Sequence, residues 1–376
     1  MRIGVIGGGQ LARMMVPPAV ALGIELKVLA ETDGSSAAIA ATAVGDYRDA
    51  AAVLAFAKTV DVITFDHEHV PQSVLAQLAA TGVAVHPGPD ALAVAQDKIV
   101  MRERLTALGA PVPDWAAVSS AAELGEFLEA HGGAAVVKTP RGGYDGKGVR
   151  VVRAANEADD WFAAAAGEAG GASALLVEEL VDFRRELAQS VARRPSGETA
   201  AWPLVETVQL DGVCSEVTAP APGSEHLAAA AYELAVDIAE GLGVTGVLAV
   251  ELFETRDGRL LVNELAMRPH NTGHWTIDGA VTSQFEQHLR AVADLPLGDP
   301  SPLAPWSVMV NVLGGPEGAT MPDRYAAALA AEPAVKFHSY GKTSRPGRKV
   351  GHVTTVGSDL DEVLARARAA AGFFQG

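Results

Sequence analysis

The residues with the clearest chemical potential are two glutamates in the stretch VLAVELFETRDGRLLVNELAM, residues 247–267. Asp257-Gly258 is typical of a two-residue hairpin turn, and pairing the strands outward from it places Glu251 opposite Glu264. Opposed side chains on neighbouring strands lie about 4.5–5.5 Å apart at Cβ, so two like charges there repel unless a cation separates them. Mg²⁺ binds one or two carboxylates together with nucleotide phosphates, which fits this pair. A solvated acidic pair is the alternative, although the flanking residues are apolar.

The loop KTPRGGYDGKGVR, residues 138–150, is a second candidate for phosphate chemistry. Its glycines allow the backbone to pass close to a ligand and to point several N–H groups at it. Lys138 stands at the end of the preceding strand and adds a positive charge. The loop is not a Walker A motif, because Lys147 is followed by Gly148 rather than by Ser or Thr. A flexible β-hairpin turn is the alternative.

A third pattern, GVIGGGQLARM at residues 4–14, matches the glycine turn of dinucleotide-binding domains. Gly7, Gly9 and Ala12 have the required spacing after an apolar strand, and Glu31 follows about twenty residues later. Taken alone, this pattern leaves an NAD-binding module open. The loop, its lysine and the two carboxylates together favour ATP used for phosphoryl transfer instead.

The elements that carry these residues begin with alternating strands and helices. Strands are expected at residues 2–7 and 24–30, and two more in the stretches VDVITFDHEHVP and GVAVHPGP, with helices between them. This alternation predicts a doubly wound, parallel α/β domain. Pro17-Pro18 falls inside the first helix, where an interior proline costs about 3 kcal/mol, so we expect that helix to kink or restart there.

The rest of the chain reads as α+β. Strands in AAVVKT, GVRVVR and ALLVEELVD flank the glycine loop, and antiparallel signals follow up to residue 267. The Pro-rich stretch at residues 296–306 reads as a linker, and the last seventy or so residues hold further strands and a closing helix. Strand alternation on the hairpin predicts that Asn263 points to the face opposite Glu264.

Composition limits the partners and the setting. The formal charge of −17 argues against nucleic acid. The sequence contains no apolar run of the roughly 20 residues that span a bilayer, and its N-terminus lacks a signal-peptide layout. A single cysteine, Cys214, permits no internal disulfide and is expected to be inert. We therefore expect a cytoplasmic protein with no nucleic-acid or membrane partner.

Several stretches together resemble one family. These are GGGQLARM, QDK, VVKTPRGGYDGKG, VEELVDFRREL, VNELAMRPHNTGHWT and RPGRKVGH. They resemble the ATP-grasp superfamily and, within it, the N5-carboxyaminoimidazole ribonucleotide synthases of purine biosynthesis. The resemblance implies a three-domain enzyme: a Rossmann-like domain at 1–95, an ATP-grasp domain made of a lid at 96–182 and a core with the metal site at 183–298, and a C-terminal domain at 299–376.

The resemblance also implies an ATP site with Mg²⁺, or Mn²⁺, on Glu251 and Glu264. Lys98 and Lys138 would contact the phosphates, Glu178 to Val181 the adenine, and Glu186 the ribose. Gln209 departs from the family, in which some members carry a histidine at this position. The residues implied to bind ATP are Lys98, Lys138, Gly143, Tyr144, Asp145, Gly146, Lys147, Gly148, Val149, Glu178, Glu179, Leu180, Val181, Glu186, Gln209, Asn263 and Glu264.

The implied reaction carboxylates the exocyclic amine of 5-aminoimidazole ribonucleotide through carboxyphosphate, using bicarbonate. Arg268, His270 and Asn271 resemble the residues that hold bicarbonate and the amine, with His270 as proton acceptor. The lid-loop residues Tyr144, Asp145 and Lys147 would face the imidazole. The residues implied to bind the ribonucleotide are Gln10, Glu68, Lys342, Arg345, Arg348 and Lys349. A solvated hairpin tip is the alternative for the last four, which form a basic cluster.

The family further implies a homodimer and a possible hand-off of product to a downstream mutase. A sister ATP-grasp enzyme, such as a formate-dependent glycinamide ribonucleotide transformylase or a biotin carboxylase, would share the ATP site and differ in its acceptor. The sequences RPHNTGHWT and RPGRKVGH argue against the transformylase and against the biotin carboxylase. A non-catalytic ATP-binding regulator is disfavoured because both lysines and both carboxylates are intact.

Overall fold

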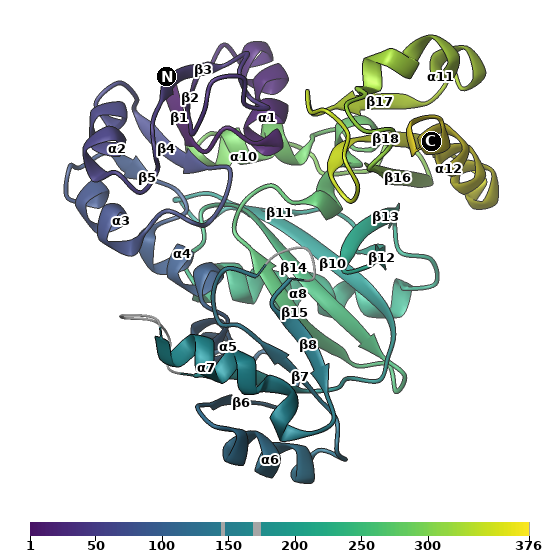
Figure 1. Ribbon diagram of the computed structural model, residues 1–376. Coiled ribbons are helices and arrows are strands. Elements are labelled where there is room, and N and C mark those ends of the chain that lie inside the picture. Colours follow the sequence, from purple (N-terminus) through teal and green to yellow (C-terminus); the bar gives the residue numbers. More distant parts are fainter. Residues whose placement is uncertain (144–146, 168–173, 376) are drawn as a thin grey trace.

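The structure, a computed structural model, describes residues 1–143, 147–167 and 174–375 and forms three β-sheets from them (Figure 1). The first sheet is parallel and has the strand order β3-β2-β1-β4-β5. Its elements are β1 (Arg2–Ile6), α1 (Gln10–Ala21), β2 (Glu25–Ala30), β3 (Ala41–Val44), α2 (Ala50–Ala57), β4 (Val62–Phe65), α3 (Gln72–Ala79) and β5 (Ala84–Val85). The predicted doubly wound domain is confirmed. The sequence reading missed β3, a short edge strand with two alanines and no buried residue.

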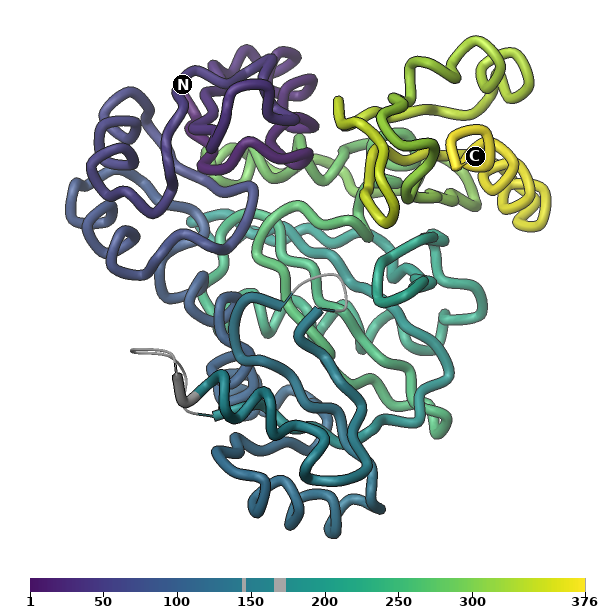
Figure 2. The backbone as a smooth tube through the Cα atoms, viewed as in Figure 1, coloured from purple at the N-terminus to yellow at the C-terminus, as the bar shows by residue number. Residues whose placement is uncertain are grey.

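Helix α1 contains Pro17 and Pro18 and yet is one helix from Gln10 to Ala21, so the predicted restart does not occur. Each proline removes a backbone donor, which weakens the helix locally. Tertiary packing compensates, because Leu11, Met15 and Ala19 are buried in a shared apolar core with α10 (Gln284–Val292). Figure 2 shows that α10 runs beside the N-terminal domain although it is distant in sequence.

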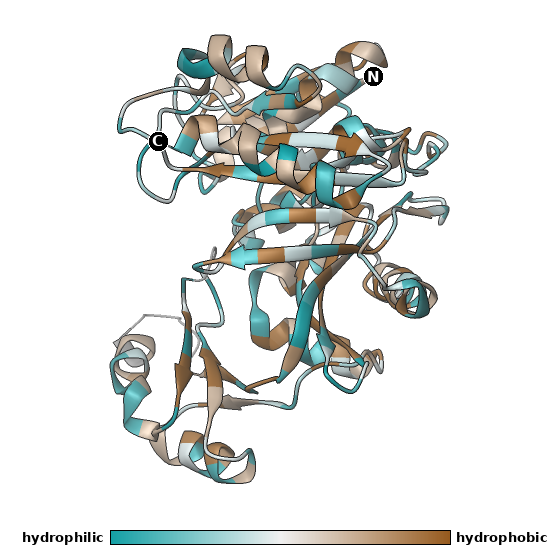
Figure 3. Cartoon of the chain, turned by 90° about the vertical axis from the view of Figure 1, so that its right-hand side faces the viewer, coloured by the Kyte–Doolittle hydropathy of each residue, from teal (hydrophilic) through white to brown (hydrophobic). Residues whose placement is uncertain are grey.

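The second sheet forms the lid and is antiparallel, with the order β6-β9-β7-β8. Its elements, with the helices around them, are α4 (Pro89–Gln96), α5 (Lys98–Ala107), β6 (Trp115–Val118), α6 (Ala121–Ala130), β7 (Ala135–Lys138), β8 (Val149–Val152), η1 (Ala155–Ala158), α7 (Asp159–Gly167) and β9 (Leu175–Glu179). The lid has its own apolar core, and its strands are mostly brown in Figure 3. The glycine loop connects β7 to β8.

The third sheet is the largest and joins the core to the C-terminal part. Its strands are β10 (Phe183–Arg193), β11 (Thr199–Ala201), β12 (Val205–Leu210), β13 (Val213–Ala219), β14 (Gly246–Thr255), β15 (Leu260–Ala266), β16 (Trp306–Leu313), β17 (Lys336–Ser339) and β18 (Lys349–Gly357). Because β13 pairs with β16, the sheet is continuous across the Pro-rich linker. The accompanying helices are α8 (Glu225–Gly241), η2 (Asn271–Gly273), α9 (Thr276–Gly279), α10, η3 (Met321–Arg324), α11 (Tyr325–Ala331) and α12 (Leu360–Gln375).

Among the described residues, no helix combines the length and the apolar character needed to cross a bilayer.

Candidate active site

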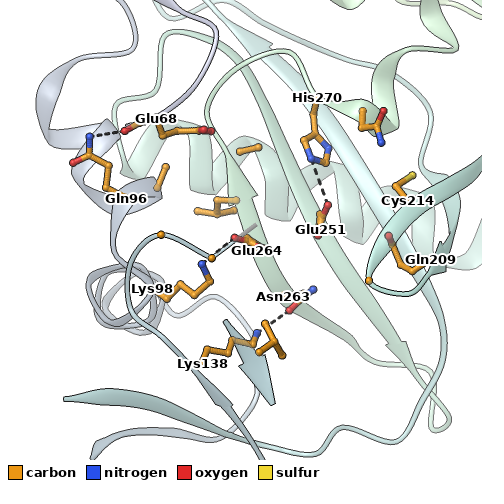
Figure 4. Close-up of a pocket in the computed structure, with 18 of the residues that line it drawn as sticks. Glu68, Gln96, Lys98, Lys138, Gln209, Cys214, Glu251, Asn263, Glu264 and His270 are labelled. Carbon is orange, nitrogen blue, oxygen red and sulfur yellow. Dashed lines mark hydrogen bonds and ion pairs between the residues drawn. The ribbon is translucent and has the colours of Figure 1, made fainter. Parts of the chain in front are cut away.

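A cavity of about 1160 Å³ lies where the N-terminal domain, the lid and the core meet (Figure 4). Nineteen of the residues that the sequence singled out line it: Gln10, Glu68, Lys98, Lys138, Gly143, Val149, Glu178, Glu179, Leu180, Val181, Glu186, Gln209, Glu251, Asn263, Glu264, Arg268, His270, Asn271 and Lys349. Those described but not lining it are Lys147, Gly148, Lys342, Arg345 and Arg348. Tyr144, Asp145 and Gly146 lie outside the described residues.

The predicted pairing of Glu251 with Glu264 is confirmed, but not by the predicted route. The turn spans Arg256–Gly258, because Thr255 N–H bonds to the Arg259 carbonyl at 2.9 Å, so the expected two-residue turn is wrong. This shifts the register by one residue near the turn. A β-bulge between Glu251 and Leu252 then shifts the register back.

The same bulge corrects the prediction for Asn263. Opposite Leu252 stands Val262 and opposite Glu251 stands Glu264, so Asn263 is the extra residue. A bulge breaks the alternation of side chains along its strand. Both Asn263 and Glu264 therefore line the cavity, and Lys138 Nζ donates to Asn263 Oδ1 at 3.2 Å (Figure 4).

Glu251 lies in an environment that disfavours its negative charge. Burial and the neighbouring Glu264 raise the pKa of Glu251 to about 8. His270 Nε2 lies 3.5 Å from Glu251 Oε1, and burial, with nearby Arg268 and Lys349, holds the pKa of that histidine well below its ordinary value. A neutral His270 supplies little charge to offset Glu251. On the other side, Lys98 Nζ lies 3.5 Å from Glu264 Oε1.

Lys138 belongs to a buried ion-pair network that was not predicted from the sequence. Its Nζ lies 2.6 Å from Glu178 Oε2, and the fully buried Arg102 donates from Nε to the other oxygen of Glu178. Burial disfavours the charged carboxyl, yet Lys138 and Arg102 hold the pKa of Glu178 below its ordinary value. Arg102 Nη2 also donates to the carbonyl of Asn263 at 2.7 Å, so it ties the lid to the bulge.

Arg102 was missed, although one signal pointed to it. It lies four residues after Lys98 on α5, the spacing that places two side chains on one helix face. Asp97 caps this helix by accepting from Ile99 N–H at 3.0 Å, and its second oxygen accepts from Arg141 Nε at 2.8 Å. The cap therefore anchors the start of the glycine loop beside Lys98.

The residues expected to meet the ribonucleotide come together across domains. Arg268 Nε donates to Glu68 Oε2 at 2.8 Å, joining the core to the N-terminal domain. Gln10 accepts from Lys342 Nζ, which brings the C-terminal part to the same edge of the cavity. Lys349 lines the cavity wall, whereas Arg345 is exposed and Arg348 donates to the Thr343 carbonyl at 3.0 Å. Of the basic cluster, only Lys349 lines the cavity, and we call the other three, Lys342, Arg345 and Arg348, the rim residues.

The glycine turn is occupied by the protein's own carboxylates. Asp66 accepts from Gly9 N–H at 3.0 Å and from Ala12 N–H at 2.7 Å, and Glu31 accepts from Gly8 N–H at 3.2 Å. A Cβ on Gly9 would lie 2.0 Å from Asp66 Oδ2. These are the amides that would bind the pyrophosphate in a dinucleotide domain. The glycines serve close packing here, which disfavours the NAD-binding alternative.

Gln209, the departure from the family pattern, lines the cavity beside the ribose candidate. Burial raises the pKa of Glu186, and a side-chain hydrogen bond from Gln209 opposes that change. Gln209 therefore contacts Glu186. Cys214 is the strand partner of Gln209 and its side chain is buried.

Comparison with known proteins agrees with this geometry. A family model described as an ATP-grasp domain matches residues 103–285, a ribonucleotide synthetase preATP-grasp domain matches 1–96, and a phosphoribosylaminoimidazole carboxylase C-terminal domain matches 307–366. The fold is thus that of the ATP-grasp enzymes, and the chain is an ATP-using ligase.

Relatives of similar sequence identify the family of ATP-grasp ligases to which the chain belongs. The chain is 52% identical over 374 residues to the N5-carboxyaminoimidazole ribonucleotide synthase of Mycobacterium bovis, covering 98% of this chain and 86% of the relative. For the Corynebacterium ammoniagenes synthase the identity is 50%, covering 99% and 91%. The chain therefore belongs to the N5-carboxyaminoimidazole ribonucleotide synthase family, whose reaction lies in purine biosynthesis.

Solved structures give the same answer. The synthetase from Thermus thermophilus is 37% identical and superposes with a TM-score of 0.86, covering 98% of each chain. The Aspergillus clavatus enzyme, in complex with ADP and 5-aminoimidazole ribonucleotide, is 31% identical with a TM-score of 0.88, covering 99% of this chain and 98% of that one.

Proposed function

We propose that this chain carboxylates the exocyclic amine of 5-aminoimidazole ribonucleotide with ATP and bicarbonate, the activity named for its family. One observation carries the proposal. The carboxylate pair Glu251–Glu264 shares a single cavity with the interdomain pair Arg268–Glu68. A site for phosphoryl transfer therefore opens onto a separate polar wall that can hold an acceptor.

The chemistry divides into two steps with balanced atoms. A bicarbonate oxygen attacks the γ-phosphorus of ATP, ADP leaves, and carboxyphosphate forms. Cleavage of its C–O bond gives CO₂ and phosphate. The amine nitrogen then bonds to the CO₂ carbon and loses a proton, and His270 accepts that proton. His270 can take this role because its lowered pKa leaves one ring nitrogen unprotonated; Nδ1 lies 3.0 Å from Thr272 Oγ1 and Nε2 lies 3.5 Å from Glu251 Oε1.

A divalent cation fits the paired carboxylates. Two glutamates with an unfavourable shared charge can bind Mg²⁺, or Mn²⁺ in its place, when nucleotide phosphates and water complete the shell. No set of three or more acidic, histidine or cysteine ligands occurs in the described part of the chain, so the nucleotide must supply the other ligands. The cation would neutralise charge on the transferring phosphoryl group.

Other residues that line the cavity are assigned to the three parts of ATP. Lys98 and Lys138 bind the phosphates, and Glu186 with Gln209 binds the ribose. Glu178 is fully engaged by Lys138 and Arg102, so the adenine is bound by the backbone from Glu178 to Val181.

Lid-loop and rim residues complete the proposal. The lid-loop residues 143–149 close over the phosphates, with Tyr144, Asp145 and Lys147 toward the imidazole. Lys342, Arg345 and Arg348 bind the ribonucleotide phosphate at the rim. Lys349, close enough to lower the pKa of His270, faces the reacting groups. Assembly as a cytoplasmic homodimer and hand-off of the product to a mutase belong to the same proposal.

An oxygen label tests the carboxyphosphate step. Bicarbonate carrying ¹⁸O should transfer one labelled oxygen to the released phosphate, because the P–O bond formed in the first step survives the second. Phosphate that instead takes its new oxygen from labelled water would show hydrolysis of ATP without bicarbonate attack.

A further inference from the structure

Gln284 clamps the backbone of His270 from the neighbouring helix. Its side chain is fully buried at the start of α10. Gln284 Oε1 accepts from His270 N–H at 2.8 Å, and Gln284 Nε2 donates to the His270 carbonyl at 2.7 Å. The amide orientation is fixed by this pair of bonds, because the backbone N–H can only donate and the carbonyl can only accept.

The second hydrogen on Gln284 Nε2 sets the state of another histidine. His274 Nδ1 lies 2.9 Å from that nitrogen, so Nδ1 must accept. Burial, with Lys349 next in effect, holds the pKa of His274 well below its ordinary value, and the ring is neutral. A neutral ring that accepts at Nδ1 carries its proton on Nε2. His274 is therefore a hydrogen-bond donor at Nε2.

Among the described residues, His274 Nε2 has no hydrogen-bond partner. Asn271 Nδ2 and Oδ1 have none either. His274 is 0% exposed and Asn271 is 9% exposed, and both line the cavity beside His270. The ring is held between His352, with centroids 5.1 Å apart, and Phe285 at 5.6 Å. Buried polar atoms are almost always satisfied, so a ligand is expected to satisfy these.

We propose that His274 is a further ligand-binding residue, whose Nε2–H donates beside Asn271 to an oxygen of bicarbonate and of the carboxyl group in transfer. Gln284 is the positioning residue that fixes this tautomer and the backbone of His270. This inference rests on the proposed function and adds His274 and Gln284 to the side of the cavity where bicarbonate and the carboxyl group are proposed to bind. A neutral donor suits this place because Arg268 and Lys349 already supply positive charge nearby.

The helix offers a matched control. Gln287 lies one turn further along α10, is also 0% exposed, and clamps a backbone in the same way. Its Oε1 accepts from Gly298 N–H at 2.7 Å and its Nε2 donates to the Gly298 carbonyl at 2.8 Å. Gln287 does not line the cavity. Gln284→Met and Gln287→Met therefore remove equivalent pairs of side chain–backbone bonds, and only Gln284→Met also removes a bond to His274 at the site.

The kinetic test compares these variants with His274→Phe. A hydrogen bond to a charged ligand is worth about 1.5–3 kcal/mol, so Gln284→Met and His274→Phe should raise the KM for bicarbonate about 10- to 100-fold with the KM for ATP unchanged. Gln287→Met should leave both constants unchanged. Equal effects of Gln284→Met and Gln287→Met, or equal rises in both KM values, would overturn the proposal.

The tautomer is tested separately by ¹⁵N NMR of histidine-labelled protein, with the His274 signal assigned from His274→Phe. The wild type should show protonated Nε2 and unprotonated Nδ1, and Gln284→Met should lose this preference. A protonated Nδ1 in the wild type would refute the inference. If bicarbonate-dependent turnover were missing altogether, the proposed function would fail, whereas the NMR result would still report on Gln284 and His274.

Discussion

Burial of Glu251, together with repulsion from Glu264, predicts that replacing Glu251 by a neutral side chain stabilises the ligand-free protein while removing the cation site. The pKa of Glu251 rises from 4.5 to about 8 in the folded protein. A carboxyl whose folded pKa is raised binds its proton more tightly than in the unfolded chain. Its contribution to stability is therefore largest at low pH and is lost as pH rises from 4.5 through 8.

The magnitude follows from the same values. One pKa unit corresponds to about 1.36 kcal/mol, so the full change gives a loss of about 5 kcal/mol at high pH. The Glu251 side chain is 23% exposed, and water screens part of the repulsion. We therefore expect Glu251→Gln to raise the stability at pH 8.5 by about 2 kcal/mol, and by much less at pH 5.

Thermal unfolding of the ligand-free protein at these two pH values measures this difference. Glu264→Gln should give a smaller gain, because it removes the repulsion, leaves Glu251 buried and breaks the ion pair with Lys98. Glu233→Gln, an exposed position on α8, is the control and should change nothing. Mg²⁺ with ADP should stabilise the wild type most at high pH and should stabilise Glu251→Gln less, because that variant keeps the nucleotide contacts and loses a cation ligand. Equal melting temperatures of Glu251→Gln and the wild type at pH 8.5 would refute the reasoning.

Three further predictions concern the surrounding residues. Arg348→Ala should raise the KM for the ribonucleotide with the KM for ATP unchanged, and the reverse in steady-state kinetics would contradict the rim assignment. Arg102→Leu leaves Glu178 with one partner and should lower the stability by about 3 kcal/mol in denaturant unfolding, a cost typical of broken buried pairs; a loss under 1 kcal/mol would argue against the network. Gly9→Ala should lower the melting temperature because its Cβ would meet the Asp66 carboxylate, and an unchanged melting temperature would contradict that packing.

In the hairpin, the pairing of Glu251 with Glu264 was predicted correctly from the sequence, although the turn and the register used to predict it were wrong. The Asp257-Gly258 turn is one residue longer than predicted, and the bulge at Asn263 restores the register before Glu251. Neither feature has a strong local signal, because a bulge depends on the pairing strand. The bulge is also what brings Asn263 to the cavity, which strict alternation excluded.

The glycine turn shows the limit of a motif taken alone. Its spacing predicts the strand–turn–helix geometry correctly, and β1 and α1 are where that pattern places them. The ligand of the turn could not be predicted from the spacing, because Glu31 and Asp66, the residues that follow β2 and β4, accept hydrogen bonds from the amides of the turn in the folded protein.

Residues that act through others were the hardest to find. Gln284 and Arg102 bond to backbone atoms of His270 and Asn263, and only the folded chain shows which backbone lies beside them. Residues proposed to contact a ligand directly were predicted from sequence motifs shared with the family and from the two glutamates that face each other across the hairpin. The predicted domain boundaries stay a prediction. The third sheet extends across the boundary predicted at residue 298, because β13 pairs with β16.

The central claim is that one cavity couples ATP cleavage to carboxylation of the ribonucleotide. Phosphate release, measured with ATP, bicarbonate and 5-aminoimidazole ribonucleotide all present and then with each left out in turn, tests it most directly. We expect rapid release of phosphate with all three substrates and a large drop when any one of them is missing. Release that ignores the ribonucleotide, or that responds equally to formate or biotin, would contradict it.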